Sequence, residues 1–105
     1  MRGELWIAQA DLYASKVRPV LVVQADNHDI YDSIVTCLLT SYANDKNSAR
    51  IEIKPDDINN LKSTSFVMVD KIFSFDKADL DRCIGRLSDK DMAAVSDKMK
   101  AFLGL

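Results

Sequence analysis

Two short apolar runs joined by a polar connection constrain this chain more than any other feature. The runs, Arg18–Val23 and Ile34–Ser41, have the length and β-branched content of buried strands. The connection, residues 25–33, is rich in Asp and Asn, as expected of a turn. We therefore expect an antiparallel hairpin whose turn is centred near Asp29.

This register places Arg18 opposite Thr40 at the open end of the hairpin. Directly opposed side chains lie about 4.5–5.5 Å apart at Cβ. A guanidinium beside a hydroxyl can bind a phosphate oxygen. Taken alone, an arginine at a strand start is more often a surface ion-pair partner, and a threonine at a strand end is more often a strand former. An offset of one residue would also turn the two side chains to opposite faces.

Three further motifs accompany Arg18–Val23 in sequence order. They are Arg2–Trp6, Leu39–Ser41 and Ser65–Ile72. Together the four motifs resemble the MazF/PemK family of toxin–antitoxin endoribonuclease toxins. The resemblance runs from Arg2 to about Leu103, so residues 1–105 form a single MazF/PemK-like toxin domain in this interpretation. It implies a mainly β fold with α: a small antiparallel β-barrel of the CcdB/PemK plasmid-maintenance toxin type with a C-terminal helix.

The function that this resemblance implies is cleavage of single-stranded RNA by a sequence-preferring endoribonuclease that needs no metal and no cofactor. The RNA 2′-hydroxyl would attack the adjacent phosphorus and leave a 2′,3′-cyclic phosphate and a 5′-hydroxyl. The implied partners are a second copy in a homodimer and a cognate antitoxin of the MazE/PemI kind. DNA would be contacted only through an antitoxin complex, and no membrane is involved.

The same resemblance implies the catalytic residues Arg18, Thr40 and Asp70. We expect Lys16, Ser41, Lys71 and Phe73 to bind RNA. Lys71 and Phe73 occupy positions where relatives often have Gln and Arg, but a lysine can contact a phosphate and a phenylalanine can stack on a base. Arg18 and Thr40 would stabilise the negative charge of the phosphorane, since an arginine guanidinium stays charged near neutral pH. Asp70 is a candidate base for the 2′-hydroxyl proton. Taken alone, Asp70 is more often a strand-end acid that pairs with a lysine, and Phe73 is as often a core residue.

The charge balance of the chain opposes RNA binding at first sight. The formal net charge is −2 and the isoelectric point is about 5.2, whereas a nucleic-acid binder usually has a basic surface. Affinity depends on the local field rather than on the total charge. RNA binding therefore requires Lys16, Arg18 and Lys71 to gather on one face.

The composition indicates the structural class of the chain and its cellular compartment. At 105 residues with 48% hydrophobic content, the chain predicts one globular domain. It has no apolar run of about 18 residues and no signal-peptide layout, so we expect it in the cytoplasm. Cys37 and Cys83 fall in predicted strands without metal-ligand spacing, which predicts two reduced core thiols. The hairpin places the single histidine, His28, about 20 Å from the Arg18–Thr40 pair.

Other strands follow from alternation of polar and apolar residues. They are expected at Glu4–Gln9, Arg50–Lys54, Ser65–Val69, Lys71–Phe75 and Arg82–Leu87, the third and fourth being two strands or one bent strand. Residues 10–17 form a loop. Ser88 and Asp91 resemble a capping box at the start of a C-terminal helix. An apolar stripe from Met92 to Leu103 predicts that this helix covers one side of the barrel.

Two alternatives belong to other functional classes. A CcdB-like toxin has the same barrel but binds gyrase through the end of its C-terminal helix, for which Phe102–Leu105 would serve. A catalytically silent member would bind an antitoxin or RNA without turnover. Discrete fragments from total RNA in the presence of a chelator would distinguish the nuclease from both.

Overall fold

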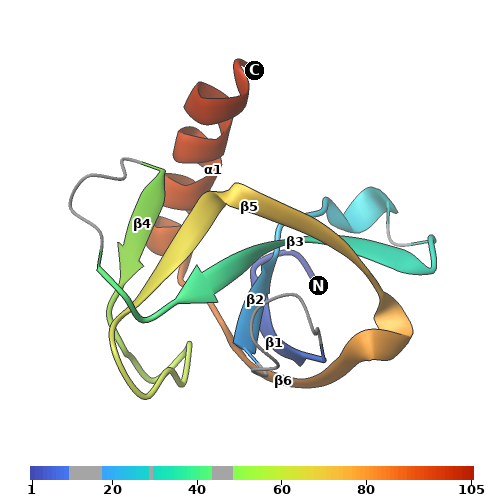
Figure 1. Cartoon of the computed structure of the whole chain (residues 1–105), viewed down its shortest axis with the longest axis horizontal. Helices are drawn as coiled ribbons and strands as arrows, with labels where there is room; N and C mark the ends of the chain where they lie inside the picture. Colours follow the sequence, from blue (N-terminus) through green and yellow to red (C-terminus); the bar gives the residue numbers. More distant parts are fainter. Residues whose placement is uncertain (10–17, 29, 44–48) are drawn as a thin grey trace.

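Six strands and one α-helix make up the computed structural model, which describes residues 1–9, 18–28, 30–43 and 49–105 (Figure 1). The elements are β1 (Glu4–Ala8), β2 (Arg18–Val22), β3 (Ser33–Thr40), β4 (Arg50–Ile53), β5 (Ser65–Asp76), β6 (Leu80–Arg86) and α1 (Asp89–Leu103), with short 3-10 helices at Asp26–His28 and Lys77–Asp79. The predicted loop at residues 10–17 lies outside the described residues. The mainly β fold with a C-terminal helix is confirmed.

The hairpin register predicted from the sequence is observed. Leu21 of β2 faces Cys37 of β3, and the neighbouring pairs Val20–Leu38 and Val22–Thr36 follow the same register. Continuing this ladder by two residues brings Arg18 level with Thr40. The turn is braced from within, because Gln24 Oε1 accepts a hydrogen bond from the Val35 N–H at 3.1 Å.

The sheet is antiparallel throughout, in the order β4-β5-β3-β2-β1-β6. Among the described residues, the edge strands β4 and β6 do not pair, so strand hydrogen bonds do not close the barrel. The connection between β4 and β5 bridges the gap instead. The Arg86 N–H donates to the Ile58 carbonyl at 3.1 Å, and Asn60 Nδ2 donates to the Ile84 carbonyl at 2.8 Å.

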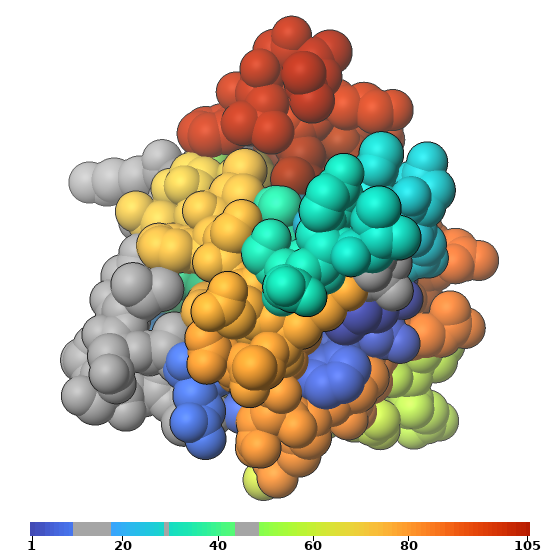
Figure 2. Space-filling view, turned by 90° about the vertical axis from the view of Figure 1, so that its right-hand side faces the viewer, coloured from blue at the N-terminus to red at the C-terminus, as the bar shows by residue number. Residues whose placement is uncertain are grey.

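One bent strand, β5, replaces the two strands Ser65–Val69 and Lys71–Phe75. Its pairing with β3 slips between Leu38, which faces Met68, and Cys37, which faces Ile72. The residues between Met68 and Ile72 therefore bulge from the ladder, and a bulge bends its strand. The bend lets β5 reach from β4 to the β6 side of the molecule (Figure 1). From the side, β5 lies between α1 and β6 (Figure 2).

Alternation along the strands divides the core into two clusters. On β2, Leu21 packs with Val95 of the helix, whereas Val20 and Val22 pack on the opposite face of the sheet with Phe75. The central strands β2 and β3 therefore bury both faces, one on the side of the helix and one inside the curled sheet. This two-sided burial explains why the strand sequences are continuous apolar runs.

The helix begins as predicted, because Ser88 Oγ accepts a hydrogen bond from the Asp91 N–H at 3.1 Å. Its stripe covers the sheet only in part. Val95 is fully buried, but Phe102 and Leu103 are 52% and 45% exposed, because the end of α1 extends beyond the sheet (Figure 1). None of the described helices is both long and apolar enough to cross a bilayer.

The two cysteines differ in environment, which corrects the prediction of two core thiols. Cys37 is fully buried in β3, whereas Cys83 is exposed on β6. β6 is an edge strand with one neighbour, so alternation alone does not bury its side chains. Both thiols are free.

Candidate functional site

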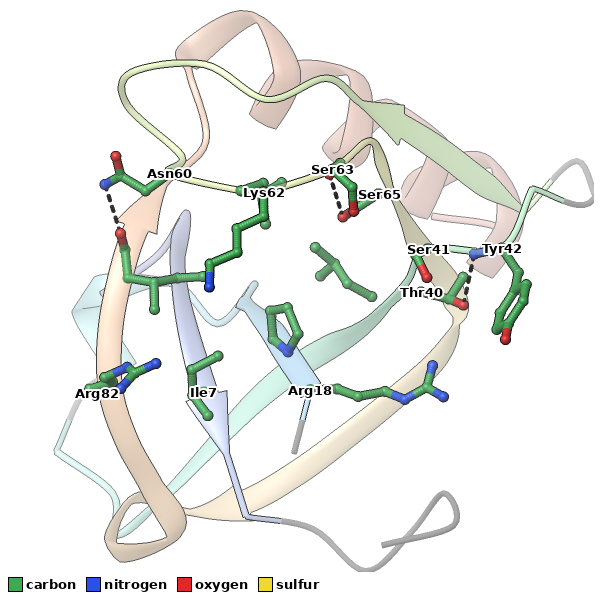
Figure 3. Close-up of a pocket in the computed structure, with 14 residues that line it drawn as sticks. Ile7, Arg18, Thr40, Ser41, Tyr42, Asn60, Lys62, Ser63, Ser65 and Arg82 are labelled. Carbon is green, nitrogen blue, oxygen red and sulfur yellow. Dashed lines mark hydrogen bonds between the residues drawn. The ribbon is translucent and has the colours of Figure 1, made fainter. Parts of the chain in front are cut away.

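A pocket of about 460 Å³ opens at the end of the β2–β3 hairpin, where Arg18 and Thr40 were expected to meet (Figure 3). Both residues line it. The described lining residues come from β1, β2, β3, β5, β6 and the loop before β5: Ile7, Arg18, Pro19, Leu39, Thr40, Ser41, Tyr42, Asn60, Leu61, Lys62, Ser63, Ser65, Arg82 and Ile84.

Apolar side chains from adjacent strands form the floor of the pocket. Ile7 of β1 is paired with Pro19 on one side and with Arg82 of β6 on the other. Leu39 and Ile84 extend this apolar surface from β3 and β6. The floor can take the face of a planar ligand, while the polar groups of the rim select what binds beside it.

Arg18 and Thr40 stand together at one side of the rim (Figure 3). Thr40 is buried, and its Oγ1 accepts a hydrogen bond from the Tyr42 N–H at 3.3 Å. A hydroxyl has one donor and two acceptor positions, so this bond leaves the hydroxyl proton available. A guanidinium and a free O–H donor side by side suit the oxygens of a phosphate.

Three cations, Arg18, Lys62 and Arg82, occur among the described lining residues, and none of these lining residues carries a carboxylate. None of the three makes a salt bridge to a carboxylate in the described ranges. A pocket lined by one sign of charge raises the local concentration of the opposite sign. The pocket therefore attracts anions although the whole chain is acidic.

Lys62 and Arg82 were missed from the sequence, and Lys71 was expected in their place. Lys62 lies in the connection before β5, which has no periodicity from which a direction could be derived. Arg82 reaches the pocket only through the pairing of β6 with β1. A topology placing the last strand beside the first was the one signal that would have identified it.

Of the predicted RNA-binding residues that the structure describes, only Ser41 lines the pocket. Lys16 lies outside the described residues. Lys71 and Phe73 are absent from the described lining, because the bulge and bend of β5 carry them to other surroundings. Phe73 packs beside Phe75, with ring centroids 6.4 Å apart, on the second core cluster, which favours the core interpretation of this residue.

Asp70 also lies apart from Arg18 and Thr40 within one chain. Leu38 faces Met68 and Cys37 faces Ile72, so Asp70 lies in the bulge beside these two residues of β3, which are two and three residues from Thr40 and thus about 7–10 Å from it along the strand. The Asp70 Oδ1 atom is buried without a hydrogen-bond partner. Burial, and secondarily the nearby Asp70 charge, raise the pKa of Cys37 to about 11. Asp70 is not among the described lining residues of the pocket, and its role as a base stays a prediction.

His28 is exposed in the 3-10 helix Asp26–His28 and does not appear in the described lining. No group of three or more His, Cys, Asp or Glu side chains suited to a metal ion occurs within the described ranges. The pocket chemistry therefore consists of guanidinium, ammonium, hydroxyl and amide groups. These groups bind and stabilise negative charge.

Comparison with known families gives a match over almost the whole chain. Residues 1–103 match the family of the PemK-like, MazF-like toxin of type II toxin–antitoxin system. A curated relative, the probable endoribonuclease MazF of Mycolicibacterium smegmatis, is 32% identical over 105 residues, covering 99% of this chain and 96% of the relative.

Solved structures share the fold. The Mycobacterium tuberculosis toxin MazF-mt6 matches with a TM-score of 0.82 and 22% identity, covering 97% of both chains. A mycobacterial endoribonuclease in complex with its cognate antitoxin matches with a TM-score of 0.84 and 21% identity, covering 100% of this chain and 95% of that one. A MazE–MazF complex from Deinococcus radiodurans matches with a TM-score of 0.78 and 19% identity, covering 99% and 95%.

Proposed function

The chain belongs to the PemK/MazF family of toxins of type II toxin–antitoxin systems, and we propose that it acts, as a single toxin domain, as an endoribonuclease on single-stranded RNA. The observation that carries this proposal is the meeting of Arg18 and Thr40 in one pocket whose charged described lining residues are all cations. Such a pocket suits the phosphodiester backbone of a single strand. The relative named as an endoribonuclease supports the same activity.

In the proposed reaction the nucleophile comes from the substrate. The RNA 2′-oxygen bonds to the adjacent phosphorus, the bond to the 5′-oxygen breaks, and a 2′,3′-cyclic phosphate and a 5′-hydroxyl remain. The guanidinium of Arg18 and the hydroxyl of Thr40 bind the non-bridging oxygens, where negative charge grows as the phosphorane forms. This charge stabilisation comes from the side chains, so we propose a reaction independent of metal ions.

Two proton transfers accompany the changes in the bonds to phosphorus. The 2′-hydroxyl loses a proton and the departing 5′-oxygen gains one, so the step is balanced without net consumption. An arginine side chain does not serve as a proton donor near neutral pH, and Asp70 is not among the described lining residues of the pocket. We therefore assign both proton transfers to solvent water rather than to Asp70.

The products test this reaction directly. Purified protein is incubated with total RNA and with a defined oligoribonucleotide, each with excess chelator. Discrete fragments ending in a cyclic phosphate are expected, and an oligonucleotide with one 2′-deoxy sugar at the cut site should remain intact, because it lacks the nucleophile. Cleavage of that deoxy substrate, or no cleavage of any RNA, would refute the proposal.

Protein partners are the second part of the proposal. The matched structures include endoribonuclease–antitoxin and MazE–MazF complexes, so we propose a cognate antitoxin of the MazE/PemI kind and a homodimer of this chain. DNA would then be reached only through the antitoxin complex. Sedimentation at micromolar concentration should give the mass of two chains, and a monomer would contradict the dimer.

A gyrase-binding toxin is the second candidate, and the end of α1 favours it. Phe102, Leu103 and Leu105 are 52%, 45% and 88% exposed, which is an unusual exposure of apolar surface for a helix end. Inhibition of DNA supercoiling by gyrase, together with intact RNA, would support this candidate. Tight RNA binding without either effect would identify a catalytically silent member.

A further inference from the structure

The three cations of the pocket stand at two separate places on its rim. Arg18 lies with Thr40 on one side, while Lys62 reaches into the pocket from the opposite side, where Arg82 also lies (Figure 3). The ladder explains the separation, since Pro19 of β2 and Arg82 of β6 both pair with Ile7 of the strand between them. Two strand spacings correspond to about 10 Å between the Cα atoms of Pro19 and Arg82.

Apolar surface fills the interval between the two cationic sides. Ile7 lies in it (Figure 3) and is paired with Pro19, and the lining residue Ile84 is hydrogen-bonded to Asn60. A single phosphate is too small to contact both sides at once. Two phosphates joined by one nucleoside can do so, with the base lying on the apolar floor.

Lys62 is held in this direction by its own loop. Asn60, whose φ is +54°, donates from Nδ2 to the Ile84 carbonyl at 2.8 Å. The preceding Asn59 is fully buried, and its side chain bonds to the backbone of Lys54, Asp56 and Leu61. The loop is therefore fixed on β6 immediately before Lys62, so this lysine has a defined place at the pocket.

Lys62 and Arg82 gather without a described acidic partner in a chain that has 16 acidic residues. Like charges that line one pocket repel each other, and an anion bound between them removes this repulsion. We propose that Lys62 and Arg82 form a second phosphate-binding subsite, which holds the phosphate next to the one cleaved at Arg18 and Thr40. This inference rests on the proposed function and adds that one pocket holds two consecutive phosphates of the RNA strand.

The test separates binding from cleavage. Lys62→Ala, Arg82→Ala and the double variant are compared with the wild type, and Arg86→Ala and Lys90→Ala serve as controls because neither residue lines the pocket and both are exposed. KM should rise about tenfold in the double variant, with kcat within about twofold of the wild type. The slope of log affinity against log salt should fall by about 0.7 for the lost phosphate contact.

A neutral methylphosphonate identifies the phosphate concerned. It replaces, in turn, the phosphate on either side of the cut site in an oligoribonucleotide whose cut-site sugar is 2′-deoxy, and binding is measured. One of the two replacements should weaken binding to the wild type about tenfold and leave binding to the double variant unchanged. Equal losses in both proteins, or none in either, would overturn the subsite.

The failures of the subsite and of the proposed function are distinguishable. If RNA is cleaved but the double variant keeps the wild-type KM and salt slope, the subsite is refuted and the nuclease remains. If RNA is not cleaved but the double variant loses salt-dependent binding, the subsite remains and the nuclease is refuted. Both readouts use the full chain, and thermal unfolding of each variant checks that it folds.

Discussion

At the scale of single residues, burial decides what each chemical group can do. Cys37 and Cys83 carry the same thiol, but one is fully buried beside Asp70 and the other is exposed on an edge strand. Thr40 is buried too, yet its hydroxyl keeps a free proton because it accepts from Tyr42. Residue type alone therefore does not define a site.

The raised pKa of Cys37 has a consequence for stability. Its pKa is about 11 in the folded chain, against a reference value of 9.0, so the unfolded chain loses this proton first. The Cys37 contribution to stability is then complete below about pH 9 and is lost as the pH rises toward 11. Unfolding followed at increasing pH should show this loss in the wild type and a smaller one in Cys37→Ala.

Thiol labelling of the native protein checks the same assignment. One thiol per chain, that of Cys83, should react with a soluble disulfide reagent, and the second should react only after unfolding. Cys83→Ser should remove the native reaction altogether. Two equally fast thiols in the wild type would contradict the burial of Cys37.

Asp70→Asn tests whether the carboxylate takes part in cleavage. Because Asp70 is not among the described lining residues of the pocket, kcat for RNA cleavage should stay within about threefold of the wild type. The pKa of Cys37 should fall, because the Asp70 charge contributes to its rise. A loss of kcat of about 100-fold or more would restore the general-base role.

At the scale of elements, the connection between β4 and β5 joins the two edges of the sheet that strand pairing does not join among the described residues. It bridges the unpaired edges of the sheet through Ile58 and Asn60, and it carries Lys62 to the pocket. Gly85 of β6 permits this contact, since an added Cβ would lie 2.5 Å from the Ile58 carbonyl oxygen and 2.7 Å from that of Asn59. The connection between β4 and β5 thus both joins the two edges of the sheet and forms one wall of the pocket.

Gly85→Ala should therefore affect stability and binding together. Backbone atoms crowd the new methyl group, so we expect a loss of about 1–3 kcal/mol in the free energy of unfolding and a raised KM for RNA. Gly104→Ala is the control, because its φ is +75° but no atom lies within 4 Å of the added Cβ. It should lose stability through backbone strain and keep its KM. An unchanged KM in Gly85→Ala would show that the connection does not shape the pocket.

At the scale of the whole molecule, the sequence predicted local features better than distant contacts. The hairpin register, the Ser88 cap and the family motifs depend on neighbouring residues, and the structure reproduces the register and the cap. The bulge of β5 and the convergence of Lys62 with Arg82 depend on how the sheet curls, which no local pattern encodes. The same reason explains why the sequence could not give the position of Asp70, since that position follows from the bulge.

Charge is likewise a property of the assembled molecule. A net charge of −2 argued against RNA binding from the composition, but folding separates the charges. Three cations converge on one pocket without a carboxylate among its described lining residues. The composition gives the net charge of the chain, but it does not give the positions of the charged side chains in space.

We propose that Arg18 and Thr40 stabilise the phosphorane in this pocket. Single-turnover cleavage of one defined RNA, with chelator, measures this stabilisation in the wild type, Arg18→Ala, Thr40→Val and the control Arg86→Ala. We expect Arg18→Ala to lower the cleavage rate about 10²–10³-fold, Thr40→Val to lower it less, and Arg86→Ala to cleave like the wild type in keeping with this mechanism. An Arg18→Ala protein that cleaves as fast as the wild type would contradict it.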